Sequence, residues 1–570
     1  MKKLAMLTVK GAVGLVPKVV RNKLKTNHYL TELYSRSLQR SGLFYGFPSE
    51  KKIRALYNIY LKQQSAKLSS LYLSNKDINN LHVFIVGDEN VDLTINSVVK
   101  AGVDTTKVSV ITRQSPKECV RSYASFRDAI ATLPSDIRTL FVNSGDSIGR
   151  TEIAAFVQLS HSSDIAYCDT DKVSAKKQRV SPHFSPDWNP DLQLSTGYVS
   201  TGVLIHSQIL KQASITASSI AGLVLELWFK NTSRLIKHIP FTLVHRGNSK
   251  LTGQKALRDM GQILSKFSNA ISTYNEQQEI NHIQWPILSE PKVSLIIPTK
   301  NGKKLVKACI ESILEKTTYQ NFEILLIDNN SDEQESLDYF DELNKHQKIR
   351  LLRYPEPFNY SAINNFAVKQ VSHDSKIIGL INNDIEVIKP KWLTHMVGHA
   401  LREDVGCVGA KLLYSDDRIQ HAGVVLGYGG GAGHAHKYFP SYHPGYMKRL
   451  IATQNYSAVT AACLLIKRTL FNKVGGLNEK DLAVAFNDVD FCLRVKETGA
   501  RNVYCAEAEL YHHESVSRGT DHAPEKAARF NKELSYLKST WGQYIQHDPA
   551  YSPNLTLRRE NFSLKTKEEF

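Results

Sequence analysis

The sequence has few cysteines, and their spacing predicts neither a metal site nor a disulfide framework. Seven cysteines are scattered over 570 residues, and no two of them form a CxxC pair. An odd number without paired spacing argues against a zinc ribbon and against a secreted, disulfide-stapled scaffold. We therefore expect a protein of a reducing compartment, the cytoplasm.

Long apolar runs are also absent. Crossing a bilayer takes about 18 to 20 consecutive apolar residues, and no segment of the chain reaches that length. The first residues, MKKLAMLTVKGAVGLVPKVV, begin like a signal peptide, but Lys10, Pro17 and Lys18 interrupt the apolar stretch and no clear cleavage site follows. The sequence predicts neither a spanning helix nor a cleaved leader.

Two phosphate-binding motifs are missing. No GxGxxG follows a predicted strand, which argues against an NAD-binding fold, and no GxxxxGK[ST] indicates a P-loop. A basic stripe interleaved with aromatic side chains, which is typical of nucleic-acid binding, is not seen either. We expect no nucleic-acid partner.

Acidic residues are outnumbered by basic ones. The chain has 72 Lys and Arg against 55 Asp and Glu, a net charge of +17, and much of the excess lies in the first 25 residues. Such a charge favours polyanionic neighbours, including nucleotide phosphates and anionic lipid. A basic helix lying on a membrane surface and a solvated helix packed on the next domain both fit this segment.

The length predicts about two to four domains. After a helical start, LHVFIVG, KVSVITR and RTLFVNSGD alternate with helical segments, which indicates a parallel sheet, and the same rhythm returns with VSLIIP, FEILLID and IIGLINND. The predicted regions are a basic helical region (1–78), a first α/β domain (79–250), a helix and linker (251–290), a second α/β domain (291–540) and a C-terminal tail (541–570).

Polar side chains follow three predicted strands of the second domain. Open α/β sheets bind ligands beyond the carboxyl ends of their strands, so these positions predict a binding site. At Asp328 and Asp384 a capping or turn role is an open alternative. The residues are Pro298, Thr299 and Asn301 after VSLII, Asp328 after FEILLI, and Asn382, Asn383 and Asp384 after IIGLI.

Two later segments add titratable groups. In FNDVDFCLRV, Asp488 and Asp490 are two positions apart and cannot share one helical face, so at most one reaches a common cleft; Asp488 would also suit a helix N-cap. LYHHESVSRG contributes His512 and His513, either of which can complete the shell of a divalent cation, and Arg518, which can brace a diphosphate.

A further group of histidines lies in and around a glycine-rich loop, GYGGGAGHAHKYFP. The spacing of His421, His434, His436 and His443 matches no closed zinc site, and we interpret the loop as a flexible lid.

Taken in order, IIPTKNG, LLIDNNS, NND, FNDVDFCLR and HHESVSRG resemble the family-2 glycosyltransferases of the GT-A fold. The likeness is strongest to the rhamnosyltransferase-like enzymes of bacterial lipopolysaccharide, O-antigen and capsule, in which FNYSAINNFAV, IQHAGVVLG, GHAHK and DPAYSPNLTL also recur. It covers about residues 291 to 558. The resemblance implies two tandem GT-A domains (nucleotide-diphospho-sugar transferase, Rossmann-like), the first of them degenerate.

The resemblance also implies an activity. It is the inverting transfer of a sugar from a UDP-, dTDP- or GDP-sugar to a hydroxyl of a glycan or lipid-linked glycan, in the cytoplasm or peripherally on the inner face of the membrane. Asp488 would be the general base, and Asp384 with His512 would hold Mg²⁺ or Mn²⁺, although Asn382 replaces the first acidic residue of the family's DxD motif. Nucleotide-sugar binding would fall to Pro298, Thr299, Asn301, Asp328, Asn365, Asn382, Asn383 and Arg518.

The first α/β domain keeps less of this pattern. It contains DTDKV and PHFSPDWNPDLQLSTGYVSTGVLIH, which resemble family-2 segments, but it lacks the PTxN turn and offers only Asp146 at the metal position and Glu226 near that of the base. We predict a noncatalytic domain. A second active site stays open as an alternative, as does a nucleotidyltransferase that releases pyrophosphate.

Overall fold

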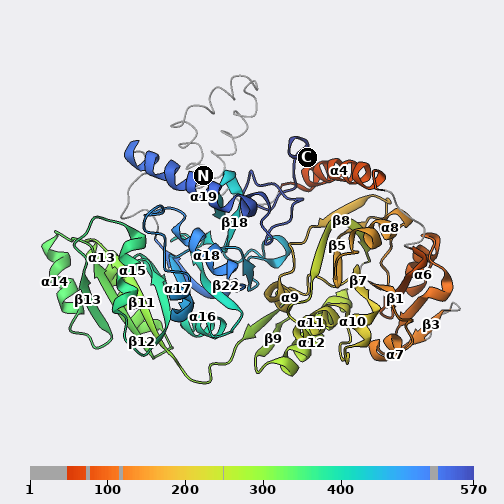
Figure 1. The fold of residues 1–570 in the computed structure, drawn as a ribbon, viewed down its shortest axis with the longest axis horizontal. Helices are drawn as coiled ribbons and strands as arrows, with labels where there is room; N and C mark the ends of the chain where they lie inside the picture. Colours follow the sequence, from red (N-terminus) through yellow and green to blue (C-terminus); the bar gives the residue numbers. More distant parts are fainter. Residues whose placement is uncertain (1–47, 72–77, 115–119, 248–249, 514–523) are drawn as a thin grey trace, which may run out of the picture.

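The computed structural model describes residues 48–71, 78–114, 120–247, 250–513 and 524–570. Figure 1 shows two sheets side by side, each flanked by helices, with a small hairpin of β9 (Ile271–Asn275) and β10 (Ile280–Gln284) between them. The basic first 25 residues, for which a helix on a membrane surface and a solvated helix packed on the next domain were both open, lie outside the described residues. Helix α4 (Glu50–Ser69) is the first helix of the described residues.

The first sheet has the order β3-β2-β1-β4-β7-β5-β6, and β8 also pairs with β5. Its first four strands are parallel, β7 runs antiparallel between β4 and β5, and β8 is again parallel to β5. The strands are β1 (Leu81–Val86), β2 (Val108–Ile111), β3 (Arg121–Tyr123), β4 (Arg138–Asn143), β5 (Ile165–Val173), β6 (Arg179–His183), β7 (Val203–His206) and β8 (Ile236–Arg246).

The second sheet has the order β13-β12-β11-β14-β21-β16-β22-β15. Here too the first four strands are parallel, and one antiparallel strand, β21, separates β14 from the parallel pair β16 and β22. The two sheets therefore repeat one topology, and the predicted α/β class is confirmed. The strands are β11 (Lys292–Thr299), β12 (Phe322–Asp328), β13 (Ile349–Arg353), β14 (Ser375–Ile381), β15 (Ile385–Val387), β16 (Val405–Leu413), β21 (Cys463–Lys467) and β22 (Arg501–His512).

Helices cover both sheets, as parallel strands require. Around the first sheet they are α6 (Val91–Lys100), α7 (Phe126–Ala131), α8 (Arg150–Leu159), α9 (Pro190–Thr196), α10 (Ser207–Lys211), α11 (Ile220–Lys230) and α12 (Lys250–Phe267). Around the second they are α13 (Lys303–Lys316), α14 (Gln334–Leu343), α15 (Tyr360–Gln370), α16 (Trp392–Ala400), α17 (Arg468–Lys473), α18 (Asn487–Glu497) and α19 (Pro524–Gln546). Among the described helices, none combines the length and apolar character needed to cross a membrane.

Strand β14 lies in the middle of the second sheet and leads directly into the site. Its apolar side chains are fully buried between helices on both faces. At Gly379 a Cβ atom would come within 2.7 Å of Leu295 and 2.9 Å of Leu465, so only glycine fits between the neighbouring strands.

The two sheets are joined by buried polar contacts. Asp191 of α9 accepts a hydrogen bond from Arg402 at 2.6 Å and one from Asn455 at 2.7 Å, while Asn189 and Asn455 bond to each other through side chain and backbone. Burial alone would raise the pKa of Asp191, but Arg402 and Arg501 hold it below its ordinary value. Breaking such a pair typically costs about 3–5 kcal/mol, so the first domain is firmly attached to the second.

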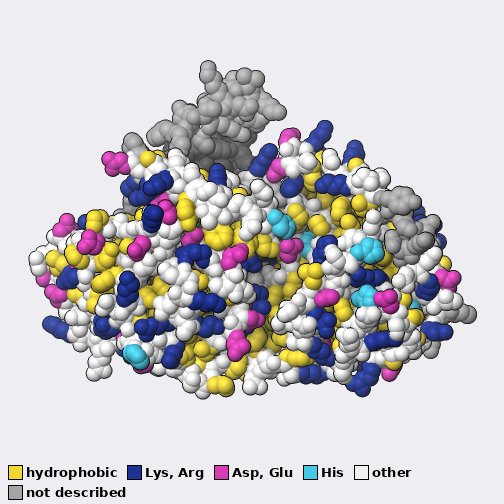
Figure 2. Space-filling view, viewed as in Figure 1, with side chains coloured by type: hydrophobic (Ala, Val, Ile, Leu, Met, Phe, Trp, Pro, Cys, Tyr) yellow, Lys and Arg dark blue, Asp and Glu magenta, His cyan; other side chains and the backbone are white. Residues whose placement is uncertain are grey.

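The C-terminal end of the chain returns to the first domain, where Phe570 lies beside Tyr60 of α4 (Figure 1). Basic side chains on the visible face are spread singly among acidic and uncharged ones and form no continuous stripe (Figure 2). The domain boundaries expected from the sequence, after residues 78, 250, 290 and 540, stay a prediction.

Candidate active site

The strand β14 ends in a polar turn that faces the last residues of β22. The Asp384 side chain is buried, and its Oδ1 lies 3.2 Å from Nε2 of His512, which is also 3.2 Å from Nδ2 of Asn382. The backbone N–H of His513 donates to the carbonyl of Asp384 at 2.9 Å, and this bond holds the turn against the end of β22. The structure thus brings together Asn382 and Asp384 of the NND motif and His512 of the later HHES segment.

The neighbouring histidine has other partners. His513 lies 3.2 Å from Glu386 through Nε2 and 2.7 Å from the Ser415 hydroxyl through Nδ1. It therefore points away from Asp384, and His512 is the histidine at the predicted metal position.

One carboxylate, one imidazole and one amide can provide part of a cation shell. No group of three or more Asp, Glu, His or Cys side chains in the described ranges could hold a metal by itself. Among the residues that the structure describes, the buried Nδ1 atom of His512 has no hydrogen-bond partner, so none of them gives the support that usually orients a metal-bound histidine. A divalent cation fits here only if phosphate oxygens and water supply its remaining ligands.

The turn after β11 lies next to this group. Asn383 donates from Nδ2 to the Thr299 hydroxyl at 2.9 Å, and that hydroxyl donates to the carbonyl of Asn301 at 3.2 Å. Asn301 has a left-handed backbone (φ 52°), and its amide bonds to Asp332. Pro298 precedes this turn within β11, paired with Ile327. The ends of two adjacent parallel strands therefore form one polar edge.

Asp328 forms the next part of this edge. Its carboxylate accepts from the backbone N–H of Ser331 at 3.1 Å and forms an ion pair with Arg353, its neighbour on β13. The capping alternative is wrong for Asp328, because α14 begins at Gln334 after Glu333. Any ligand that binds Asp328 would share the carboxylate with Arg353.

For two predicted ligand-binding residues, Asn365 and Arg518, the structure does not show a place at this polar edge. Asn365 of α15 uses its amide to bind the backbone of Leu477 in both directions, at 2.9 Å each, and to reach Glu479 at 3.1 Å. Its amide therefore holds the loop after α17, and contact with a ligand stays a prediction. Arg518 lies outside the described residues.

Asp488 stands in the first turn of α18. Its half-buried carboxylate accepts hydrogen bonds from the backbone N–H groups of Ala461 (3.1 Å) and Val489 (2.8 Å) and from the side chain of Thr460. Burial raises the pKa of Asp488 even against these hydrogen bonds. The residue before the helix is Phe486, so Asp488 is not its N-cap.

The second carboxylate of the same motif faces elsewhere. Asp490 accepts from Nε of Arg494 at 2.8 Å and from Nε1 of Trp541 at 2.9 Å, and it is buried. As expected from their two-residue spacing, the carboxylates of Asp488 and Asp490 point in different directions. Of the two, Asp488 is the one that faces the polar edge of the second sheet.

Residues 460–462 connect Asp488 to the Asp384 turn. The backbone N–H of Asn382 donates to the carbonyl of Ala462 at 3.0 Å, and the N–H of Ala461 donates to Asp488. One short segment therefore sets the position of both carboxylates. The Asp488 carboxylate and the Asp384 turn therefore lie on the two sides of this segment.

The first sheet contains a counterpart of the Asp384 turn. Asp146 immediately precedes Ser147, which bridges to His245, just as Asp384 precedes Ile385, which pairs with His512. The Asp146 carboxylate is occupied by the Thr201 hydroxyl (2.5 Å) and by the backbone N–H groups of Gly247 and Asn143 (2.8 and 3.2 Å). Its ligand positions are filled by the chain itself.

The histidine of this counterpart is turned away from Asp146. His245 bonds instead to Asp171 at 2.6 Å, and Asp171 also accepts from Tyr57 of α4 at 2.5 Å and from Arg179 at 2.7 Å. Glu226 is buried within α11, where it accepts from the backbone of Thr216 and Ala217, and it is not presented as a base.

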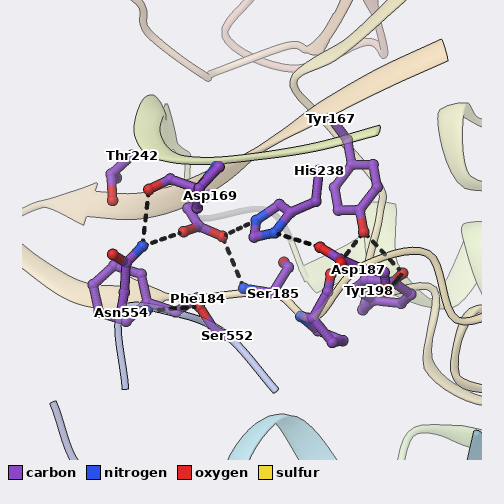
Figure 3. Close-up of polar contacts among 12 residues, drawn as sticks. Tyr167, Asp169, Phe184, Ser185, Asp187, Tyr198, His238, Thr242, Ser552 and Asn554 are labelled. Atoms are coloured by element: carbon purple, nitrogen blue, oxygen red, sulfur yellow. Dashed lines mark hydrogen bonds and ion pairs between the residues drawn. The ribbon is translucent and has the colours of Figure 1, made fainter. Parts of the chain in front are cut away.

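Asp169 is the centre of a second closed network (Figure 3). Its carboxylate accepts from His238 Nε2 and the Ser185 N–H, both at 2.8 Å, and from Asn554 of the C-terminal tail at 3.0 Å. Burial disfavours a charged imidazole, yet Asp169 and Asp187 raise the pKa of His238 to about 9. The DTD sequence of the first domain therefore anchors the tail and helix α4.

The glycine-rich loop was predicted as a flexible lid, and the structure shows a hairpin there. Strands β18 (Val424–Leu426) and β19 (Ala432–His434) pair. The backbone N–H of Leu426 donates to the Asp548 carboxylate of the C-terminal tail at 2.8 Å. His436 is buried and stacks on Phe562. No motif or residue pattern indicated that the C-terminal tail would hold this loop.

Comparisons with known proteins support the family. A model of glycosyl transferase family 2 matches residues 294–475. Uncharacterized protein y4gI of Sinorhizobium fredii is 42% identical over 423 residues, which are 70% of this chain and 46% of that protein. O-antigen biosynthesis protein RfbC of Myxococcus xanthus is 33% identical over 423 residues, 71% of this chain and 32% of that protein. The chain thus spans less than half the length of these curated relatives.

A solved structure, GalNAc-T7 with UDP, GalNAc and Mn²⁺, matches 48% of this chain and 52% of its own, with 13% identity and a TM-score of 0.38. The family match includes Thr299, Asp328 and Asp384, while Asp488 and His512 follow its end. The match to the family model thus identifies a family-2 glycosyltransferase domain within residues 294–475 of this chain.

Proposed function

We propose that this protein is an inverting glycosyltransferase that moves a sugar from a nucleotide-diphosphate sugar to a hydroxyl of a growing cell-surface glycan. The observation that carries the proposal is the placement of Asp488 and of the Asp384–His512 pair on either side of residues 460–462. The name of the RfbC relative supports an O-antigen type of glycan; capsule is the other product class that the sequence suggests.

Asp488 is the general base of the proposed reaction. The acceptor oxygen attacks the anomeric carbon, the bond from that carbon to the diphosphate oxygen breaks, and the acceptor proton passes to the Asp488 carboxylate. A raised pKa brings a carboxylate closer to the operating pH and makes it a better proton acceptor. The hydrogen bonds from Ala461 and Val489 fix the direction of the carboxylate.

Asp384 and His512 would hold the divalent cation, Mg²⁺ or Mn²⁺. When bound, such a cation neutralises charge that develops on the departing nucleoside diphosphate. Because Asn382 is neutral, the protein supplies a single carboxylate, and the diphosphate itself becomes an important ligand.

The remaining polar edge would bind the nucleotide. Asp328 can accept from a base N–H or a ribose hydroxyl, and the Thr299, Asn301 and Asn383 group lies between that position and Asp384. A UDP-, dTDP- or GDP-sugar is the proposed donor, and a glycan or lipid-linked glycan the acceptor. Contact with the inner membrane surface through the basic N-terminal residues is part of the proposal.

The screen that tests this function uses the full chain with UDP-, dTDP- and GDP-sugars in the presence of Mg²⁺ or Mn²⁺. We expect release of nucleoside diphosphate from one donor class, and loss of that release when EDTA removes the metal. Absence of nucleoside diphosphate from every donor, with and without a lipid-linked glycan acceptor, would contradict the function.

We also propose that the first domain has no active site of its own. Asp146→Asn should leave kcat unchanged while lowering thermal stability, because the buried carboxylate serves three internal donors and a lost buried hydrogen bond costs about 1–3 kcal/mol. The measurement is donor turnover beside a thermal melt, with Asp384→Asn as the matched variant of the second domain. Loss of one of two distinct transfers in Asp146→Asn would show a second active site.

A further inference from the structure

Two histidines that the proposed reaction does not use face each other beside the site. Nδ1 of His421, at the end of β17 (Ile419–His421), lies 2.9 Å from Nδ1 of His434, the last residue of β19. The rings are perpendicular, with centroids 5.0 Å apart. At this distance one nitrogen carries a hydrogen and donates, and the other accepts.

The backbone around His421 decides which nitrogen donates. Its Nε2 accepts from the N–H groups of Gly423 (3.3 Å) and Thr460 (3.5 Å), so Nε2 carries no hydrogen. Burial lowers the pKa of His421 to about 3 and that of His434 well below its ordinary value, so both rings are neutral near pH 7. His421 therefore carries its hydrogen on Nδ1 and donates to His434, which must carry its own hydrogen on Nε2.

The position of this pair connects it with the reaction. Thr460, which donates to His421 through its backbone, also binds the Asp488 carboxylate through its side chain. His434 is half-buried at the edge of the hairpin, and its two ring nitrogens point in roughly opposite directions, so Nε2 faces away from His421. Within the described part of the chain, His434 Nε2 has no hydrogen-bond partner.

We propose that His434 is a further substrate-contacting residue of the transfer site: its Nε2–H donates to an oxygen of the bound substrate, and His421 is the positioning residue that fixes this tautomer. The inference rests on the proposed function. The oxygen belongs either to the diphosphate or to a sugar hydroxyl, and both accept the same hydrogen bond. A neutral donor suits this place, because a charged imidazole would repel a cation bound at Asp384.

Four variants of the full chain test the inference through nucleoside-diphosphate release with the donor found in the screen. His434→Ala should lower kcat/KM by about 10- to 100-fold, the range expected for a lost hydrogen bond to a neutral or charged oxygen. His434→Gln, whose amide N–H stands near Nε2–H, should recover most of that loss. His421→Ala should reduce kcat/KM in the same direction, and His421→Asn, which keeps a donor near Nδ1, should restore it. His373→Gln, at an exposed position outside the site, is the control.

Comparing nucleotide affinity with kcat shows whether His434 donates to a diphosphate oxygen or to a sugar hydroxyl. A weaker affinity of His434→Ala for the nucleoside diphosphate alone, measured by calorimetry with Mn²⁺, identifies a diphosphate oxygen; an unchanged affinity with lower kcat identifies a sugar hydroxyl. Wild-type kinetics in His434→Ala would overturn the inference. So would an equal loss in His434→Ala and His434→Gln together with an equal loss in His421→Ala and His421→Asn. A wild-type chain that releases no nucleoside diphosphate contradicts the proposed function itself and removes this inference with it.

Discussion

Replacing Asp488 with asparagine is expected to abolish sugar transfer while nucleotide binding stays close to that of the wild type. The asparagine amide keeps the size of the side chain but cannot take a proton, and a positioned general base contributes about 10²- to 10⁴-fold to a rate. The nucleotide edge at Thr299 and Asp328 is untouched by the change. Turnover is measured by nucleoside-diphosphate release, and affinity by calorimetry with the nucleoside diphosphate and Mn²⁺.

Asp490→Asn is the matched control for this experiment. Asp490 lies two residues away on the same helix, but its carboxylate binds Arg494 and Trp541 and does not face the edge of the sheet. The control should lose thermal stability and keep the turnover of its folded fraction. Near-normal turnover in Asp488→Asn would remove Asp488 from the reaction.

Asp384→Asn is expected to lower kcat/KM by more than about 100-fold, because Asp384 is the one carboxylate proposed for the cation and a bound metal supplies several kcal/mol of charge stabilisation. Removing its charge leaves the imidazole of His512 and the amide of Asn382 as the protein's ligands. The expected signature is a higher Mn²⁺ concentration at half-maximal rate. Activity is titrated with Mn²⁺ and with Mg²⁺ to measure it.

Asn382→Asp is the complementary variant. It places a second carboxylate beside Asp384 and His512, and we expect a lower Mn²⁺ concentration at half-maximal rate, since harder, charged oxygen ligands bind these cations more tightly. A Mn²⁺ titration that is the same in wild type, Asp384→Asn and Asn382→Asp would show that no cation binds at this turn.

Much of the fold and part of the site could be predicted from local patterns. Apolar runs followed by polar turns located β11, β12 and β14, and the carboxyl ends of parallel strands lie at one edge, so Thr299, Asp328 and Asp384 had to share it. The two-residue spacing separated Asp488 from Asp490 because it follows from helix geometry alone.

The remaining contacts depend on residues far apart in the sequence. The Arg353 partner of Asp328 required the register of β12 against β13, and Asn365 is committed to a loop more than 100 residues later. The sequence also could not show that the carboxylates of the first domain are bound by the chain itself. Asp169, for example, accepts a hydrogen bond from Asn554 of the C-terminal tail. Neither composition nor periodicity encodes such pairs, because they form only when distant parts of the chain fold together.

The facing histidines illustrate the same difficulty. From the sequence, His421 and His434 belong to a glycine-rich loop whose histidines match no zinc spacing. Their tautomers follow only from the backbone donors of Gly423 and Thr460, which the fold places beside one ring.

The most direct test of the central claim is the identity of the phosphorus-containing product. Phosphorus-31 NMR of the full chain with its donor, Mn²⁺ and a lipid-linked glycan acceptor should show nucleoside diphosphate forming as the sugar is transferred, and the Asp488→Asn chain should show none. Pyrophosphate as the product, or equal nucleoside diphosphate from both chains, would contradict a transferase that uses Asp488 as its base.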